Sequence, residues 1–257
     1  MSQKYKYQWR ITKYNPEFRD ENGHYTKIED WTSSYDIGKV FNGQLFTFEE
    51  YLHVESAYIN TILMFLKESK VKSLRVIGLE KHKFKAQQKW QFLYEDKFQH
   101  VQLEEDMVID VEDVLTICKM ILRELMYCQL LVKDKIFIHF GWDYYMYIGT
   151  NYQSAVAIKF ASNNGLYVES FQSPYYLSQE EIIRIIQWAL IDDDSIAGEE
   201  ELKKIPLKEY QNILNLSDEH PVTGIFKLNT QHKDFFQRFL SHKMDFSKYE
   251  YYLWCNN

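Results

Sequence analysis

The sequence predicts an α+β fold, with a central antiparallel β-meander over about residues 136–171 flanked by several α-helices. Three observations lead to this prediction. Between residues 136 and 171, short runs rich in aromatic and β-branched residues follow one another, as strands do. The gaps between them contain glycine and asparagine and are only a few residues long, which favours antiparallel neighbours. Helix-start signals recur before and after this segment, so helices are expected around it.

The meander is predicted to contain four strands. In the first of them, apolar residues alternate with Phe137 and His139, which is the period of a pleated strand. Asn163-Asn164-Gly165 is typical of a tight hairpin turn, because asparagine and glycine tolerate a positive φ. The four predicted strands cover residues 136–140, 143–148, 155–160 and 166–171.

The N-terminal portion is predicted to run strand, helix, strand. Apolar and polar residues alternate strictly from Tyr5 to Thr12, which indicates a half-buried strand. Thr47 and Glu50 have the spacing of a capping box, so a helix is expected from residue 48 to about residue 69. Residues 71–79 are predicted to form the second strand of this β-α-β portion.

Three further helices are predicted from their cap residues. Asp110 is expected to cap a helix that continues to about residue 132. Ser178 and Glu181 repeat the capping box, and the helix that they open is expected to reach about residue 191. The remaining expected elements are a helix over residues 231–241 capped by Thr230, and strands over residues 222–228 and 249–254.

A chain of 257 residues can form one large domain or two smaller ones. An acidic stretch over residues 99–106 follows the lysine-rich segment over residues 81–97, and a boundary between two portions of the chain is expected near this change of charge. The prediction is therefore an N-terminal portion over residues 1–105 and a second portion over residues 106–257, or one continuous domain.

The charge balance indicates which partners suit the protein. The net charge is −7 and the isoelectric point is near 5.7. An acidic surface repels phosphate backbones, which argues against nucleic acid and favours a basic protein partner. Lysines interleaved with aromatic residues over residues 81–97 leave single-stranded nucleic acid as an alternative to a solvated loop.

The cysteines and the hydropathy pattern indicate the compartment. Cys118, Cys128 and Cys255 lie among apolar residues, form no disulfide framework and lack the spacing of a zinc site. No apolar run approaches membrane-spanning length, and the first residues lack the apolar core of a signal peptide. The sequence therefore predicts a soluble cytoplasmic protein without a cofactor or a metal.

A cluster of acidic residues between residues 192 and 201 is the main candidate for a binding surface. The carboxylates at 192–194 follow a predicted helix, where they face the negative end of its dipole. A basic protein surface would compensate them. The alternatives are a hard cation such as Mg²⁺ or Ca²⁺, and a solvated loop followed by a new helix at 199–201. The predicted binding face consists of Trp142, Tyr145, Tyr147, Asp192, Asp193, Asp194, Glu199, Glu200 and Glu201.

A catalytic site in the meander is the alternative to a binding surface. His139 and Asp143 straddle Gly141-Trp142, and a histidine held by a carboxylate is the centre of many acid–base sites. Glu169 is expected on a neighbouring strand. No nucleophile accompanies these residues in the sequence, which therefore favours a hydrogen-bonded structural pair over a catalytic one.

The segments FGWDYYMYIG and GLYVESFQSPYY resemble bacterial immunity-type and related conflict-system proteins. The resemblance covers about residues 111–176. It implies a small cytosolic α+β protein that inhibits a toxin or effector enzyme without being an enzyme itself. The acidic charge and the aromatic residues agree with this, because acidic surfaces steer basic partners and aromatic side chains anchor interfaces. We therefore expect a non-enzymatic protein-binding protein. An enzyme or a nucleic-acid-processing accessory with a site in the meander is the alternative.

Overall fold

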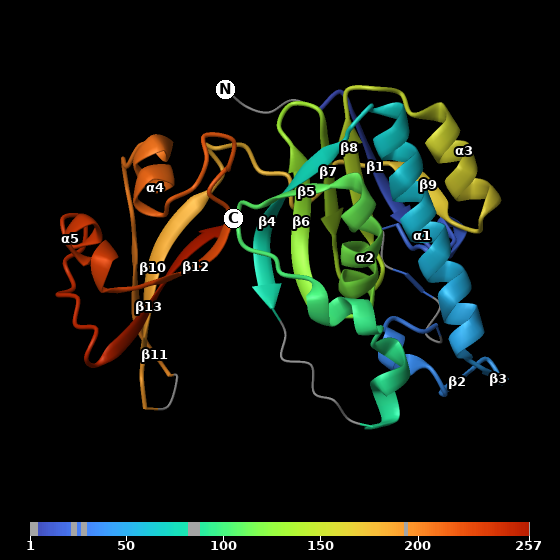
Figure 1. Cartoon of the computed structure of the whole chain (residues 1–257), viewed down its shortest axis with the longest axis horizontal. Coiled ribbons are helices and arrows are strands. Elements are labelled where there is room, and N and C mark those ends of the chain that lie inside the picture. The colour runs from blue at the N-terminus through green and yellow to red at the C-terminus, as the bar shows by residue number, and fades with distance from the viewer. Residues whose placement is uncertain (1–4, 22–24, 27–29, 82–87, 193–194, 257) are drawn as a thin grey trace. The chain divides into compact units, whose positions relative to one another are not determined.

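The computed structural model describes residues 5–21, 25–26, 30–81, 88–192 and 195–256. The chain divides into two compact units, an N-terminal unit that ends at Tyr176 and a C-terminal unit that begins at Leu177. Both consist of helices and antiparallel sheets, which confirms the predicted α+β class (Figure 1). The expected boundary near residue 105 falls inside the N-terminal unit, because strands on both sides of it share one sheet.

A seven-stranded antiparallel sheet forms the centre of the N-terminal unit. Its strands are β1 (Tyr7–Thr12), β4 (Ser73–Lys81), β5 (Val108–Asp110), β6 (Met126–Val132), β7 (Ile136–Phe140), β8 (Met146–Thr150) and β9 (Tyr167–Ser170). They lie in the order β5-β4-β6-β7-β8-β1-β9. The strands β6, β7 and β8 are consecutive in the chain and adjacent in the sheet, so they form an antiparallel meander. A separate small hairpin joins β2 (Val40–Phe41) and β3 (Gln44–Leu45).

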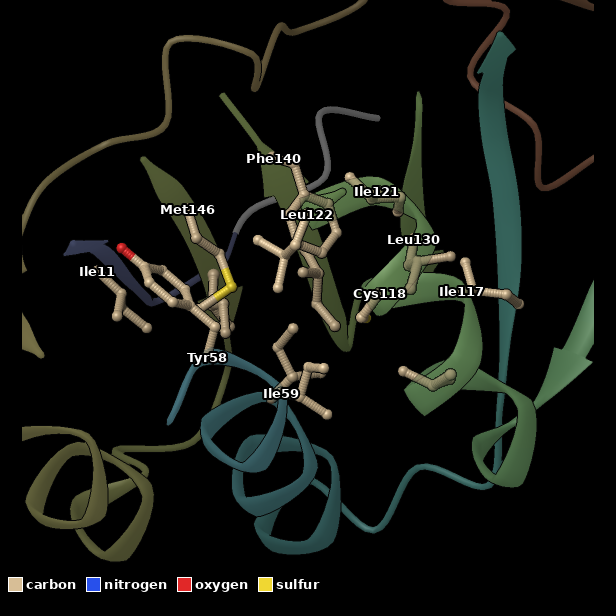
Figure 2. Close-up of a cluster of buried hydrophobic side chains, with 14 of the residues drawn as sticks. Ile11, Tyr58, Ile59, Ile117, Cys118, Ile121, Leu122, Leu130, Phe140 and Met146 are labelled. Carbon is tan, nitrogen blue, oxygen red and sulfur yellow. The ribbon is translucent and has the colours of Figure 1, made fainter. Parts of the chain in front are cut away.

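Three helices cover one face of this sheet: α1 (Phe48–Glu68), α2 (Val111–Leu122) and α3 (Ala155–Asn163) (Figure 1). Figure 2 shows side chains of the sheet, among them Ile11, Phe140 and Met146, gathered with Tyr58 of α1 and Cys118 of α2 in one apolar core. Short 3₁₀ helices lie at η1 (Pro16–Phe18), η2 (Ser34–Asp36), η3 (Gln88–Leu93) and η4 (Asp96–His100).

The start of α1 confirms the predicted capping box. The Thr47 hydroxyl accepts from the backbone N–H of Glu50, and the Glu50 carboxylate accepts from the backbone N–H of Thr47. These two hydrogen bonds satisfy donors that the first helical turn leaves without partners. The helix begins one residue after the cap, where the sequence places it.

The predicted strand over residues 155–160 is wrong, because these residues form α3. Ala157 and Ala161, four residues apart, face the core, which is the helical period. Asn164 and Gly165 therefore end a helix and do not form a hairpin turn. The strands β8 and β9 both run antiparallel to β1, so they are parallel to each other, and a parallel connection requires a crossover segment.

The predicted helix from Asp110 to residue 132 is too long. The helix α2 ends at Leu122, Glu124 adopts a left-handed φ of 58°, and residues 126–132 form β6. Side chains in β6 alternate largely between buried and half-buried positions, as they must in a strand between β4 and β7. Cys118 and Cys128 consequently lie on different elements.

A four-stranded antiparallel sheet forms the centre of the C-terminal unit. Its strands are β10 (Ile183–Leu190), β11 (Ile196–Glu201), β12 (Gly224–Leu228) and β13 (Tyr249–Asn256), in the order β11-β10-β13-β12. One face packs with the helices α4 (Leu207–Ile213) and α5 (Lys233–Phe236) around a core that includes Ile186, Phe236 and Leu253 (Figure 1). The predicted strands over residues 222–228 and 249–254 are confirmed in β12 and β13.

The helix predicted after Ser178 is wrong. The backbone N–H of Ser178 does donate to the Glu181 carboxylate at 2.7 Å, but the chain then enters β10. The strand is favoured because β10 lies between β11 and β13 and pairs with both along its length. At the helix predicted to be capped by Thr230, Asn229 accepts the first hydrogen bond instead, and the helical stretch shortens to η5 (Thr230–His232) and α5.

Candidate functional sites

His139, the first member of the predicted catalytic group, is a buried residue of β7. Its Nδ1 lies 2.9 Å from the Ser173 hydroxyl, and its ring stacks on Phe137 at 4.1 Å. The backbone N–H of Tyr175 also donates to the Ser173 hydroxyl. Burial lowers the pKa of His139 to about 3, so the imidazole is neutral at physiological pH. This arrangement fixes the segment around Ser173 on the second face of the sheet.

Glu169, the second member, is neutralised by two arginines. Arg10 donates twice to its carboxylate, each time at 3.1 Å, and Arg19 forms a further ion pair with it. Burial alone would raise the pKa of Glu169, but the hydrogen bonds from the arginines lower it below its ordinary value. The Arg10 guanidinium also lies over the Phe171 ring at 4.2 Å. Glu169 therefore remains ionised as the centre of a packed ion-pair cluster.

Asp143, the third member, lies exposed in the turn between β7 and β8. Asp143 and Tyr144 both adopt a left-handed φ, of 53° and 62°. The Tyr58 hydroxyl donates to the Tyr144 carbonyl at 2.6 Å, which holds this unusual turn against α1. Among the described residues, no hydrogen bond or ion pair joins Asp143 or Glu169 to His139. The structure therefore does not bring the three predicted catalytic residues together.

A buried lysine lies beside this turn and was not singled out from the sequence. Lys13 is 2.8 Å from the Asp30 carboxylate and lies over the rings of Tyr14 and Trp31, at 4.1 Å in each case. Burial lowers its pKa to about 8, although Asp30 opposes the effect. The sequence carried a weak signal that Lys13 is buried, since this residue directly follows a strand and precedes a buried aromatic residue.

Ser173, the partner of His139, was also not singled out from the sequence. It could have been noted because a proline fixes the chain after it.

The three aromatic residues of the predicted binding face differ in exposure. Trp142 is 84% exposed at the tip of the β7–β8 turn. Tyr145 is half-buried and stacks on Tyr14, whereas Tyr147 is buried in a small cluster on the second face of the sheet. Of the three, Trp142 alone offers its ring to a partner.

The acidic residues of the predicted binding face lie around the β10–β11 hairpin of the C-terminal unit. Asp192 is exposed two residues after β10, while Asp193 and Asp194 lie outside the described residues. Glu199, Glu200 and Glu201 form the end of β11 rather than the start of a helix. A strand and not a helix precedes this segment. The carboxylate of Asp192, the described member of the three, therefore does not face the negative end of a helix dipole.

The two faces of β11 use their carboxylates differently. Glu200 lies on the face that carries the helices, where it accepts from the backbone N–H groups of Ser241 and His242 at 2.7 and 3.1 Å. These hydrogen bonds lower its pKa. Glu199 and Glu201 project from the opposite face and are exposed. Glu201 forms an exposed ion pair with Lys203 at 3.4 Å.

Among the strands that the structure describes, β11 forms an edge of its sheet, and the register shows which of its backbone N–H and C=O groups are directed toward β10. The Leu202 N–H donates to the Arg184 carbonyl at 2.8 Å, so these two residues form a hydrogen-bonded pair. Hydrogen-bonded and non-hydrogen-bonded pairs alternate along an antiparallel ladder. The backbone groups of Glu200 are therefore directed toward β10, and those of Glu199 and Glu201 toward the free edge.

The face on which Glu199 and Glu201 lie is left uncovered by the helices of the C-terminal unit. The register aligns Glu201 with Ile185, Trp254 and Ile225 in one row across the four strands. Of the described residues, the apolar core of this unit includes none of these three apolar side chains. We call this surface the open face.

The metal-binding alternative finds no support in the part of the chain that the structure describes. No group of three or more His, Cys, Asp or Glu side chains there could hold an ion.

Within the residues that the structure describes, no helix has both the length and the apolar character needed to span a bilayer.

Comparison with models of protein families finds a match to part of the C-terminal unit. Residues 183–254 match the model of a family described as a domain of unknown function, DUF7683. The match begins with the first residue of β10 and ends within β13, so it contains β10, β11, β12 and most of β13. No curated protein matches the chain.

Proposed function

We propose that the protein is a non-enzymatic binding protein that inhibits a basic protein partner, such as a toxin or effector enzyme, and that its C-terminal unit makes the contact. The observation that carries this proposal is the distribution of charge. Residues 177–257 contain nine Lys and Arg against fourteen Asp and Glu, which gives this unit −5 of the chain's net charge of −7. Charge concentrated in this way speeds the approach of an oppositely charged partner.

The exposed apolar residues beside the acidic ones support the same surface. Ile196 is 64% exposed and Ile191 is 46% exposed, and they lie at the β10–β11 hairpin next to Asp192. Apolar side chains supply affinity once they are desolvated, while the surrounding charges determine orientation and on-rate. In the N-terminal unit, Trp142 is a separate exposed aromatic residue of the kind that interfaces favour.

The geometry around His139 favours binding over catalysis. A general base works best with a pKa near the operating pH, whereas His139 is neutral and stays so down to about pH 3. Ser173, its hydrogen-bonded neighbour, is only 2% exposed. A substrate could not reach either group without a rearrangement of the segment that covers them.

The cysteines agree with a cytoplasmic location for this activity. Cys118, Cys128 and Cys255 are buried free thiols. Burial raises the pKa of each thiol, which keeps them protonated and unreactive. A reducing compartment suits such a protein.

The proposal is tested by capturing the partner from a lysate of the source organism. The bait is the full chain, and the comparison is the double variant Glu199→Lys/Glu201→Lys, whose net charge is −3 in place of −7. We expect one stoichiometric basic protein that the native chain retains at low salt and loses as salt rises. The double variant should retain at least tenfold less of it, because two attractive charges become repulsive.

The matched control separates position from total charge. Glu80 and Glu104 are exposed acidic residues of the N-terminal unit, and Glu80→Lys/Glu104→Lys changes the net charge by the same amount. This control should capture nearly as much partner as the native chain. Equal losses in both double variants, or none in either, would contradict the assignment of the contact to β11.

A further inference from the structure

We propose that the partner binds by adding an extended strand to the free edge of β11, with lysine or arginine at alternate positions opposite Glu199 and Glu201. This inference rests on the proposed function and specifies the chemistry of the partner segment.

The backbone supplies the hydrogen bonds for strand addition. At the free edge, the N–H and C=O groups of Glu199 and Glu201 are directed away from β10, as the register requires. An extended segment laid along this edge can form both hydrogen bonds of a pair with each of these residues. Edge strands bind peptides in this way, with main-chain hydrogen bonds supplying affinity.

The side chains supply the selectivity. Residues directly opposite each other in neighbouring strands have Cβ atoms roughly 5 Å apart, so side chains opposite Glu199 and Glu201 lie within reach of the two carboxylates. Because Glu199 and Glu201 share one face, the matching basic residues must also be two apart. Lys203 competes for Glu201, but an exposed ion pair of this kind contributes little and is readily replaced.

The open face offers partly exposed apolar side chains to the long stems of basic residues. Ile185 lies beside Glu201, and Gln187 beside Glu199, on the strand next to the edge. Lysine and arginine bury their methylene groups on apolar surface while the charged end remains in water. An alternating basic segment therefore fits both the carboxylates and the apolar row behind them.

The charge pattern excludes the other natural occupant of a strand edge, a second copy of this chain. Pairing β11 with itself would bring glutamates against glutamates, which is destabilising in a sheet.

The opposite edge of the sheet, formed by β12, does not suit a basic segment. There Lys227 projects from β12 and pairs with Glu250 at 2.6 Å, so the local charge is balanced.

The first test uses a defined probe with the full chain. The probe is a ten-residue peptide in which lysine and threonine alternate, and its control has the same composition with the lysines in one block. We expect the alternating peptide to bind at least fivefold more tightly. We also expect it to slow hydrogen exchange at the backbone amides of Glu199 and Glu201, measured by nuclear magnetic resonance, because strand addition gives both amides an acceptor.

The second test removes one edge donor without a difference in charge. Glu199→Pro and Glu199→Ala both remove the carboxylate, but only proline removes the outward N–H, and proline is tolerated on an edge strand. The proline variant should bind the alternating peptide about fivefold more weakly than the alanine variant, which is the effect of one net hydrogen bond.

The possible results separate this inference from the proposed function. Strand addition is overturned if both peptides bind equally and the two amides are not protected. It is also overturned if the proline and alanine variants bind the alternating peptide equally. In either case, recognition through the acidic residues still stands. If neither peptide binds and charge reversal at Glu199 and Glu201 leaves capture of the native partner unchanged, both are overturned. The amide measurement needs no variant, so it decides even where the proline substitution prevents folding.

Discussion

Buried cations in this protein are stabilised by both carboxylates and aromatic rings. Arg10 pairs with Glu169 and lies over Phe171, and Lys13 pairs with Asp30 between two aromatic rings. A ring face attracts a cation, and this attraction is stronger where water is excluded. The high aromatic content of the chain therefore has a structural use at the residue scale, because it lets the charged side chains of Arg10 and Lys13 pack largely out of water. It need not signal an interface.

The pKa of Lys13 gives a testable pH dependence of stability. Burial lowers this pKa from 10.5 to about 8 in the folded protein. Between these values the unfolded chain binds a proton that the folded protein does not, so the contribution of Lys13 to the free energy of unfolding rises with pH. Below about pH 8 the lysine is charged in both states, and the full cost of burying its charge remains.

Lys13→Met isolates this effect, since methionine has a similar shape and does not titrate. The tyrosines and cysteines titrate alike in both proteins and cancel in the difference. The free energy of unfolding of the native chain minus that of the variant, from urea denaturation, should rise by about 2 kcal/mol between about pH 7.5 and about pH 9.5. A difference that stays constant over this range would show that Lys13 keeps its ordinary pKa.

At the scale of elements, β11 owes its position to a glycine. A Cβ atom at Gly198 would lie 2.5 Å from the ring of Trp188 on β10, which is closer than carbon atoms can approach. Trp188 cannot easily move away, because its ring stacks on His242 at 4.1 Å with only 6° between the planes. Gly198 therefore lets the acidic edge strand lie close against its neighbour.

Gly198→Ala should destabilise the C-terminal unit by about 1–3 kcal/mol, the usual cost of overpacking a well-packed site. The neighbouring exposed residue supplies the control, since Ala197→Ser changes the same strand without touching Trp188. Urea denaturation of the two variants measures the difference. Equal midpoints would mean that Trp188 can rearrange freely and that the close approach has no energetic role.

Short sequence motifs predicted where several elements begin, but contacts with distant parts of the chain determine whether some of these elements are helices or strands. The capping box at Thr47 opens a helix as expected, because its hydrogen bonds form within one turn. The similar signal at Ser178 precedes a strand, because β10 gains two strand partners, one of them about 60 residues later in the chain. Residues 155–160 suit either state, and the insertion of β1 between β8 and β9 requires the helix.

The candidate sites likewise depend on contacts between distant residues that the local sequence does not indicate. The acidic residues at 199–201 were recognisable from composition, since a charge cluster can be read locally. Their alternation between a free face and a bonded face was not, because it follows from the pairing of β11 with β10. The ion-pair cluster of Glu169 with Arg10 and Arg19 joins residues about 150 positions apart, and no local pattern indicates it.

At the scale of the whole molecule, charge and architecture divide at the same point. The N-terminal unit carries a net charge of −2 and a seven-stranded sheet, and the C-terminal unit carries −5 and a sheet and core of its own. The family match over residues 183–254 also lies wholly inside the second unit. The more acidic of the two units therefore has a sheet and an apolar core of its own.

This organisation predicts that residues 177–257 fold alone. Tyr251, Leu253 and Phe236 are fully buried within the core of the C-terminal unit, which draws on the strands β10, β12 and β13 and on both helices. The isolated segment should show a single cooperative urea transition by circular dichroism. Leu253→Ala should lower its free energy of unfolding by about 2–5 kcal/mol, whereas Lys227→Ala, on the exposed side of β12, should change it by less than about 1 kcal/mol. A gradual, non-cooperative transition of the isolated segment would mean that its core is incomplete, and a basic peptide that binds the whole chain would then have to recognise more than this unit.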